Sequence, residues 1–179
     1  MSSELKHLRE KLCRELALSE HDAVVQTSRE AAQLGPVQPA DALRAIAAHA
    51  EHLKPRFDAL LLDKQPVGIS VGRFVGEIVY GLRQLIADRI LRSERSYRAT
   101  LLALRHGLDT ARLLRDVARH EEHVHLFRFC DDLLAAREPL MREAERALGW
   151  FAEHPEIAIA SRGLARAGSR MSLPLTVRP

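Results

Sequence analysis

The sequence predicts an all-α protein, an antiparallel four-helix bundle with a crossing segment between its second and third helices. Leu, Ala, Arg and Glu dominate the chain, and all four residue types favour helices. Aromatic residues make up only 4% of the 179 residues, which suits long helices better than sheets. Apolar residues, at 46%, suffice for one domain with a substantial core. We expect the bundle in residues 1–158 and a basic, flexible tail in residues 159–179.

The first half of the chain should contain two helices. Apolar and small residues recur at helical spacing from Ser3 to Leu34, and Gly35-Pro36 supplies a stop signal. A second helix should begin near Pro39 and continue to about Leu61. Pro55 lies inside this helix and predicts a kink.

The segment from Val67 to Tyr80 is apolar on most sides and carries glycines at four-residue intervals, at Gly68, Gly72 and Gly76. Small residues at this spacing let another helix approach closely. We expect this segment to cross the bundle, because it is the long apolar connection between the second and third helices.

The second half should contain the other two helices. The third has an apolar stripe from Leu82 to Leu104 and should break near His106-Gly107. The fourth should begin near Asp109 and extend to about Glu153. Its apolar stripe changes side near His125, which implies a kink, a stutter or a change of packing partner.

The densest group of potential metal ligands is the run RHEEHVH at residues 119–125. Glu122 and His125 have the Glu-x-x-His spacing, which places a carboxylate and an imidazole side by side on a helix. Metal sites inside helical bundles use this arrangement. The run is therefore the first candidate for a metal site.

Two segments resemble those of the ferritin-like superfamily, namely ERSY at Glu94–Tyr97 and ARHEEHVH at Ala118–His125. With its expected helix order, the chain is most similar to small bacterial ferritin-like stress proteins. The resemblance implies an iron site built from one glutamate on each of two helices and Glu-x-x-His on each of the other two. The ligands in this chain would be Glu122, His125, Glu121, Glu94 and Glu51.

The second helix departs from the family pattern, because Glu51 is followed at the required spacing by Lys54 instead of histidine. Lys54 projects onto the apolar stripe, where its ammonium group would repel a divalent cation and would need a carboxylate partner. We expect Lys54 to pair inside the bundle with Glu30 or Glu121, which also project onto apolar stripes.

The sequence favours a non-catalytic protein over an enzyme. Ser19, Ser93 and Ser96 have no His or Asp at an interpretable spacing, and no glycine loop for phosphate is found. The preferred hypothesis is a bundle without a cofactor that acts through self-association or partner binding. The alternative is a ferritin-like di-metal protein that binds or oxidises iron.

We expect a homo-oligomer, with part of the interface drawn from Val67–Tyr80 or from Trp150-Phe151. The apolar side chains of these segments project in too many directions for one neighbouring helix to cover, and exposed apolar patches usually mark interaction sites. Charge is also uneven, since residues 65–119 are net basic and residues 120–158 net acidic. These two blocks are expected to face each other.

The tail is a candidate site for a protein partner, because residues 159–179 contain four arginines and no acidic residue. Its Leu175-Thr176-Val177 triplet resembles part of the C-terminal loading peptides of encapsulin cargo proteins. Nucleic-acid binding is a third hypothesis, disfavoured because the tail offers few aromatic residues for stacking.

No uninterrupted apolar stretch reaches the length of a bilayer span, so we expect no membrane insertion. Cys13 and Cys130 lie far apart in sequence, and no start resembling a signal peptide precedes them. We therefore expect reduced thiols and a cytoplasmic location.

Overall fold

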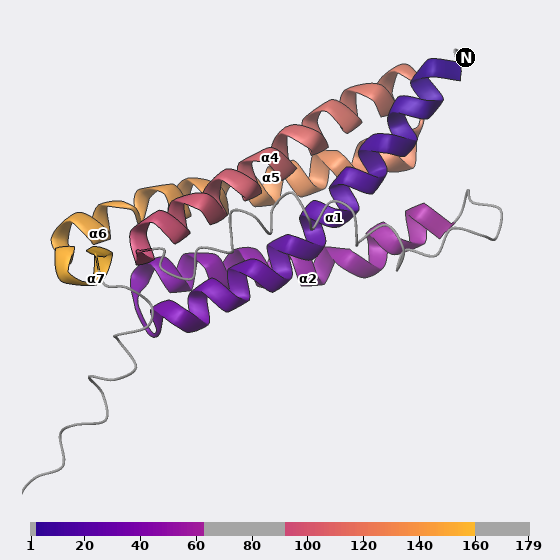
Figure 1. Cartoon of the computed structure of the whole chain (residues 1–179). Helices are drawn as coiled ribbons and strands as arrows, with labels where there is room; N and C mark the ends of the chain where they lie inside the picture. Colours follow the sequence, from indigo (N-terminus) through magenta and orange to yellow (C-terminus); the bar gives the residue numbers. More distant parts are fainter. Residues whose placement is uncertain (1–2, 63–91, 160–179) are drawn as a thin grey trace, which may run out of the picture.

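The computed structural model describes residues 3–62 and 92–159, and in these ranges the chain is all-α (Figure 1). The predicted crossing segment Val67–Tyr80 and residues 160–179 of the predicted tail lie outside the described residues. Two short helices, α6 (Gly149–Glu153) and α7 (Pro155–Ile159), follow the four long ones. The long helices are α1 (Ser3–Leu34), α2 (Gln38–Leu62), α4 (Ser93–His120) and α5 (Val124–Arg146).

The first two helices confirm the sequence prediction closely. Helix α1 ends at Leu34, and Gly35 adopts a φ of +82°, a left-handed conformation that glycine reaches without steric cost. The Gly35 amide donates to the Ala31 carbonyl at 3.1 Å, which satisfies one of the last carbonyls of α1. Pro55 lies inside α2, and the helix continues past it to Leu62.

The predicted break at His106-Gly107 is wrong, because α4 runs without interruption from Ser93 to His120. Gly107 is buried, and a Cβ atom built on it would lie 2.1 Å from Ser19 Oγ on α1. The glycine therefore serves the close approach of two helices instead of ending one.

The break lies instead between α4 and α5, so the single fourth helix predicted from Asp109 to Glu153 is also wrong. Glu122 in this turn has a φ of +56°, which is uncommon for a residue other than glycine. His123 caps α5, and its Nδ1 accepts a hydrogen bond from the Leu126 amide at 3.4 Å. The change of apolar side near His125 was a correct sign of an interruption.

Neighbouring long helices run in opposite directions. Helix α1 packs on α2 and α4, and α5 packs on α4 and α2 (Figure 1). In each of three helix pairs, residues further along one helix contact residues earlier along the other, so the two helices run in opposite directions. These contacts include Arg9–Glu121 and Glu30–Ser96 for α1 and α4, Tyr97–Ala144 and Arg112–Glu138 for α4 and α5, and His49–Arg137 and Phe57–Phe129 for α2 and α5.

Helices α2 and α4 therefore point the same way, since both run opposite to α1. The end of α2 at Leu62 and the start of α4 at Ser93 lie at opposite ends of the helical assembly (Figure 1).

The core is made of apolar side chains from all four long helices. The Phe57 ring of α2 stacks on the Phe129 ring of α5 with centroids 4.8 Å apart. The largest fully buried apolar side chains are Leu16, Leu43, Ile46, Tyr97, Leu114, Phe129 and Leu133. Among the helices in residues 3–62 and 92–159, none has the length and apolar character needed to cross a membrane.

Candidate functional site

A charged cluster lies in the interior between α1, α2 and α5. The Arg137 guanidinium donates from Nη2 to Glu20 Oε2 at 2.8 Å and from Nη1 to Glu20 Oε1 at 3.3 Å. Its third donor, Nε, reaches Nδ1 of His49 at 2.8 Å. The exposed fraction is 5% for the Arg137 side chain and 11% for Glu20. One cation is thus held by a bidentate carboxylate and an imidazole, each from a different helix.

The imidazole of His49 is neutral in this cluster. Burial lowers its pKa from 6.5 to about 4, and the positive charges of Arg137 and His52 act in the same direction. Because Nδ1 accepts the hydrogen bond from Arg137, the ring proton lies on Nε2. The cluster therefore consists of one cation (Arg137), one anion (Glu20) and one neutral hydrogen-bond acceptor (His49).

Sequence analysis missed Arg137, although a signal for it exists. The buried stripe of α5 contains Cys130, Leu133, Leu134, Arg137 and Met141, so the arginine occupies a position where the pattern calls for an apolar residue. A charge at such a position needs a buried partner. That partner could not be identified from the stripe, because Glu20 projects only to the edge of α1.

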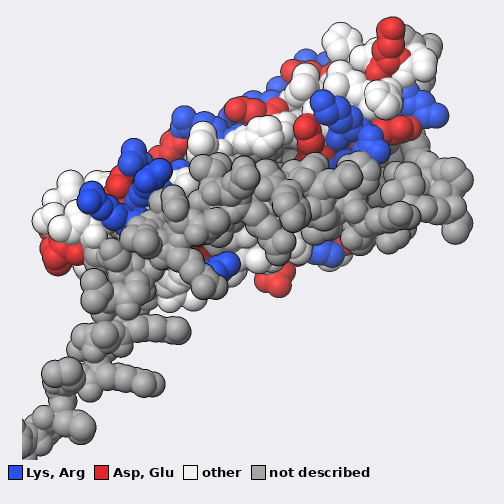
Figure 2. All heavy atoms as spheres, viewed as in Figure 1, with Lys and Arg blue, Asp and Glu red and all other residues white. Residues whose placement is uncertain are grey.

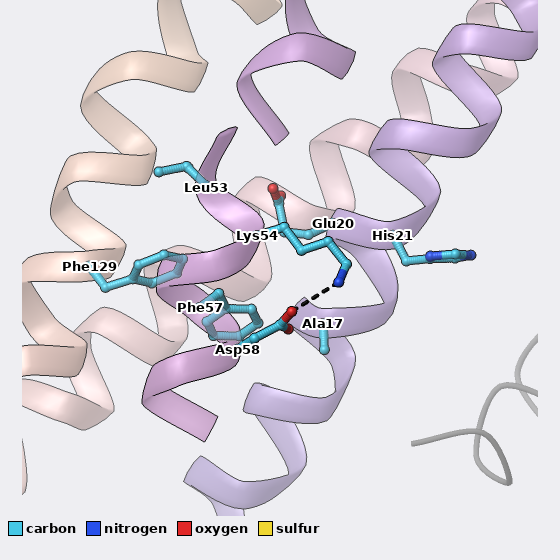
Figure 3. A pocket seen from close by; sticks show the side chains of 8 residues that line it. All are labelled: Ala17, Glu20, His21, Leu53, Lys54, Phe57, Asp58 and Phe129. Atoms are coloured by element: carbon cyan, nitrogen blue, oxygen red, sulfur yellow. Dashed lines mark hydrogen bonds and ion pairs between the residues drawn. The ribbon is translucent and has the colours of Figure 1, made fainter. Parts of the chain in front are cut away.

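A small pocket adjoins the Glu20 end of the cluster (Figure 3). Its walls are largely apolar and include Ala17, Leu53, Phe57 and Phe129. Its volume of about 40 Å³ suits a few water molecules, whereas pockets for small organic ligands are several times larger. The pocket as described is therefore too small to enclose a drug-sized ligand.

Lys54 lies at this pocket, and its predicted pairing inside the bundle is wrong. Its side chain is 61% exposed, and Nζ donates to Asp58 Oδ2 at 2.9 Å (Figure 3). In this part of α2 the buried side is formed by Leu53 and Phe57, and Lys54, which follows Leu53, points toward solvent.

The two glutamates proposed as partners of Lys54 are buried as expected, but other groups bind them. Glu30 accepts a hydrogen bond from Ser96 Oγ at 2.8 Å. Glu121 accepts one from Arg9 Nη1 at 2.7 Å, and its side chain is completely buried. Arginine and a hydroxyl group thus replace lysine as the interior donors.

The predicted metal ligands are dispersed. Glu122 is exposed in the turn and His125 is exposed at the start of α5, so they do not share a helical face. Glu121 faces α1, Glu94 forms an ion pair with Arg98, and Glu51 is exposed on α2. Within the described ranges, no three His, Cys, Asp or Glu side chains are grouped so that they could hold a metal ion.

Both cysteines are free thiols. Burial is the main cause that raises the pKa of Cys13 to about 11 and that of Cys130 to about 12. The reactive thiolate is therefore scarce at neutral pH, and neither residue is suited to nucleophilic catalysis.

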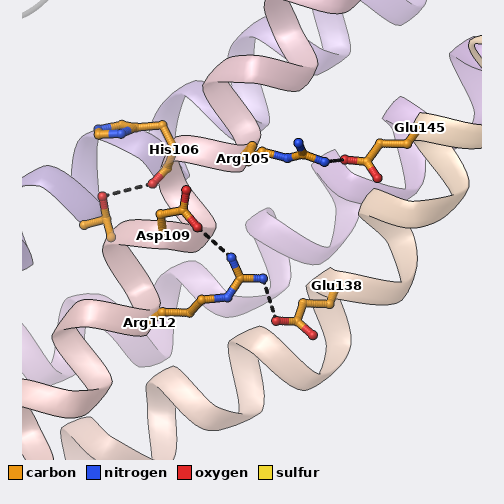
Figure 4. A network of polar contacts seen from close by, with 7 residues as sticks. Arg105, His106, Asp109, Arg112, Glu138 and Glu145 are labelled. Carbon is orange, nitrogen blue, oxygen red and sulfur yellow. Dashed lines mark hydrogen bonds and ion pairs between the residues drawn. The ribbon is translucent and has the colours of Figure 1, made fainter.

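Ion pairs join α4 to α5 along one side (Figure 4). Arg112 bridges Asp109 at 2.6 Å and Glu138 at 2.8 Å, and Arg105 pairs with Glu145. Basic residues of the block 65–119 thus face acidic residues of the block 120–158, as predicted. These pairs are exposed, so each contributes little to stability.

Comparison of the chain with protein families, with curated proteins and with solved structures found no match. The functional conclusion therefore depends on the geometry of the described residues.

Proposed function

We propose that this chain is a ferritin-like four-helix bundle of the cytoplasm that has no di-metal centre and acts through self-association or partner binding. The buried ion pair between Arg137 and Glu20 carries the proposal. Ferritin-like bundles have one long crossover connection between helices that point the same way.

The helix directions support the ferritin-like part of the proposal. Helices α2 and α4 point the same way and are joined through residues 63–91, whereas α1–α2 and α4–α5 are joined by short turns. Four-helix bundles with one long crossover have this order, and those with only short loops do not.

The Arg137 cluster supports the absence of a di-metal centre. A guanidinium is permanently charged at any physiological pH and repels a divalent cation. It also engages both oxygens of Glu20, an interior carboxylate of α1 that a metal would require. A neutral His49 is likewise engaged through Nδ1. Within this cluster the charge of Glu20 is therefore balanced by a side chain and not by a metal ion.

Exposed apolar side chains support action through association. In the described ranges, large apolar side chains with high exposure are Val25, Leu102, Leu113, Val124 and Ile159. Acidic and basic side chains are interspersed over the described part of the face in view, with no broad field of one sign (Figure 2). A mixed surface of this kind suits a protein partner better than nucleic acid.

The Trp150-Phe151 pair, predicted to form part of an interface, makes contacts within its own chain. Phe151 is buried against Tyr97, with ring centroids 5.3 Å apart. Trp150 stacks on His154 of the same chain at 4.0 Å. Intrachain packing thus covers much of this apolar surface.

Two measurements on the full chain, purified without an affinity tag, test the proposal. Elemental analysis should find iron well below about one atom per chain, and about two tightly bound metal ions per chain would favour the di-metal alternative. Light scattering should give masses above the 20.1 kDa of one chain as concentration rises. A mass of one chain at every concentration would exclude self-association and leave partner binding.

A further inference from the structure

The two cysteines of the chain occupy matching positions on α1 and α5. Glu20 of α1 binds Arg137 of α5, and these residues are 117 positions apart in the sequence. Cys13 precedes Glu20 by seven residues, and Cys130 precedes Arg137 by seven. Seven residues make about two turns, so each cysteine lies on the same side of its helix as the charged residue that follows it.

The directions of the helices place the two cysteines at the same level. Helices α1 and α5 run in the same direction, because each runs opposite to α4. A step of seven residues therefore moves along both helices by about 10 Å toward their first residues. The register that brings Glu20 to Arg137 thus brings Cys13 level with Cys130. Their electrostatic interaction agrees with this register, since Cys13 is one of the groups that raise the pKa of Cys130, after burial.

Both thiols face the interior. Cys130 is fully buried, and the half-buried Cys13 packs against the core. The residues one turn later, Leu16 on α1 and Leu133 on α5, are buried as well. Helices α1 and α5 lie diagonally across the bundle, because α2 and α4 each pack on both of them. The two thiols therefore approach each other across the middle of the four-helix assembly.

Two thiols in this arrangement suit a metal ion better than a disulfide. A disulfide requires Cα atoms within about 7 Å, whereas even neighbouring helices have axes about 8–10 Å apart and diagonal ones lie farther apart. A metal ion between the sulfur atoms adds the length of a second bond. Burial also raises the pKa of Cys13 to about 11 and that of Cys130 to about 12, so attack of a thiolate on an oxidant is slow.

The number of ligands selects the kind of ion. In residues 3–62 and 92–159, no third His, Cys, Asp or Glu completes a metal-binding group. Zinc takes at least three protein ligands, so two thiols do not suffice for it. Cu(I) is a soft ion that thiolates select, and it accepts two ligands in a line.

The surrounding charges are compatible with such a complex. Two thiolates and one Cu(I) ion carry a single negative charge. The charged groups that act on the two thiols are three of each sign, namely Arg9, Arg14, Arg115, Glu10, Glu121 and Asp131. Arg9 has the largest such effect on Cys13, and Arg115 is the cation that acts on Cys130. The negative charge of the complex would thus lie near a cation on either side.

We propose that Cys13 and Cys130 bind one Cu(I) ion between α1 and α5. Each thiol releases its proton to solvent and forms one bond from sulfur to the ion, so two protons leave and no oxidation state changes. The half-buried Cys13 provides the point of entry. The proposal is independent of the proposed self-association, because the site lies within one chain.

Anaerobic titration of the full chain with Cu(I), in competition with a chromophoric Cu(I) chelator, tests the proposal. One ion per chain should bind, and X-ray absorption should show two sulfur neighbours. Cys13→Ala and Cys130→Ala should each lower the affinity at least about hundredfold, since each removes half of the ligands. Met141→Leu removes another buried sulfur atom and is the matched control, with unchanged affinity expected. Circular dichroism checks folding, and the partly exposed position 13 keeps the test valid if Cys130→Ala does not fold.

The pH dependence distinguishes two thiols from one. Both thiols are protonated near neutral pH, so the affinity, corrected for protonation of the chelator, should rise about hundredfold per pH unit. A tenfold rise would mean that one thiol binds and would overturn the proposal. Full affinity in Cys130→Ala, or a complex in which one ion joins two chains, would also overturn it. So would a wild-type chain that takes up no Cu(I) from the chelator.

Discussion

Arg137 and Glu20 form a two-point ion pair in the interior, with nitrogen–oxygen distances of 2.8 and 3.3 Å. The pair joins α5 to α1 through groups that are almost fully removed from water. Removal of one partner would leave the other charge buried and uncompensated. Loss of either partner should therefore destabilise the fold strongly.

Arg137→Met should lower the free energy of unfolding by about 3–5 kcal/mol, because the Glu20 carboxylate loses its counter-charge. Urea denaturation followed by circular dichroism measures the change. Lys54→Met is the matched control, since it removes an exposed ion pair with Asp58 and should cost less than about 1 kcal/mol. Equal effects of the two substitutions would show that Arg137 is solvated. Glu20→Leu with Arg137→Met should recover much of the loss, because no buried charge remains.

Stability should fall in acid through His49. Its pKa is about 4 in the folded protein and 6.5 in the unfolded chain, so the unfolded chain binds more protons between these values. The contribution of His49 is present above pH 6.5, decreases as the pH falls, and is lost below about pH 4. His49→Gln, whose side-chain oxygen can accept from Arg137, should flatten this part of the stability curve. An NMR titration that finds an ordinary pKa for His49 would contradict the prediction.

Gly107→Ala should destabilise the fold by about 1–3 kcal/mol, although alanine is the better helix former. The new methyl group would lie 2.1 Å from Ser19 Oγ and 3.2 Å from Ser19 Cβ. Thermal unfolding measures the loss. Ser19→Ala removes the closer of the two contacts, so the double variant should regain part of the lost stability. A stabilising effect of Gly107→Ala alone would mean that α1 and α4 are farther apart than described.

Glu122→Gly should raise the free energy of unfolding by about 0.5–1 kcal/mol, since glycine adopts the φ of +56° without steric cost. Glu122→Ala removes the same carboxylate but keeps the Cβ atom, so it should give no such gain. Chemical denaturation of the two variants distinguishes backbone strain from side-chain loss. If Glu122 were instead a metal ligand, both substitutions would lower the metal content equally.

The ends of α1 and α2 could be predicted from the sequence because local chemistry decides them. Gly35 and Pro36 end one helix and Pro39 lies at the start of the next, and each acts through its own backbone. The apolar stripes likewise indicated four long helices, since burial of one side requires helical spacing. The boundary between the third and fourth helices was predicted wrongly, because the sequence does not distinguish a buried helical glycine such as Gly107 from a glycine that ends a helix. Its role depends on Ser19 of another helix.

Tertiary structure determines which residues meet in the interior cluster of Arg137, Glu20 and His49. The all-α class, the absence of a catalytic motif and the anomalous charge of Arg137 on an apolar stripe are all properties of the sequence. Which groups meet that charge depends on how three helices pack, because Glu20 and His49 come from α1 and α2. The same holds for Glu122 and His125, whose helical spacing loses its meaning once a turn separates them. Residue spacing sets geometry within one helix, and only packing sets it between helices.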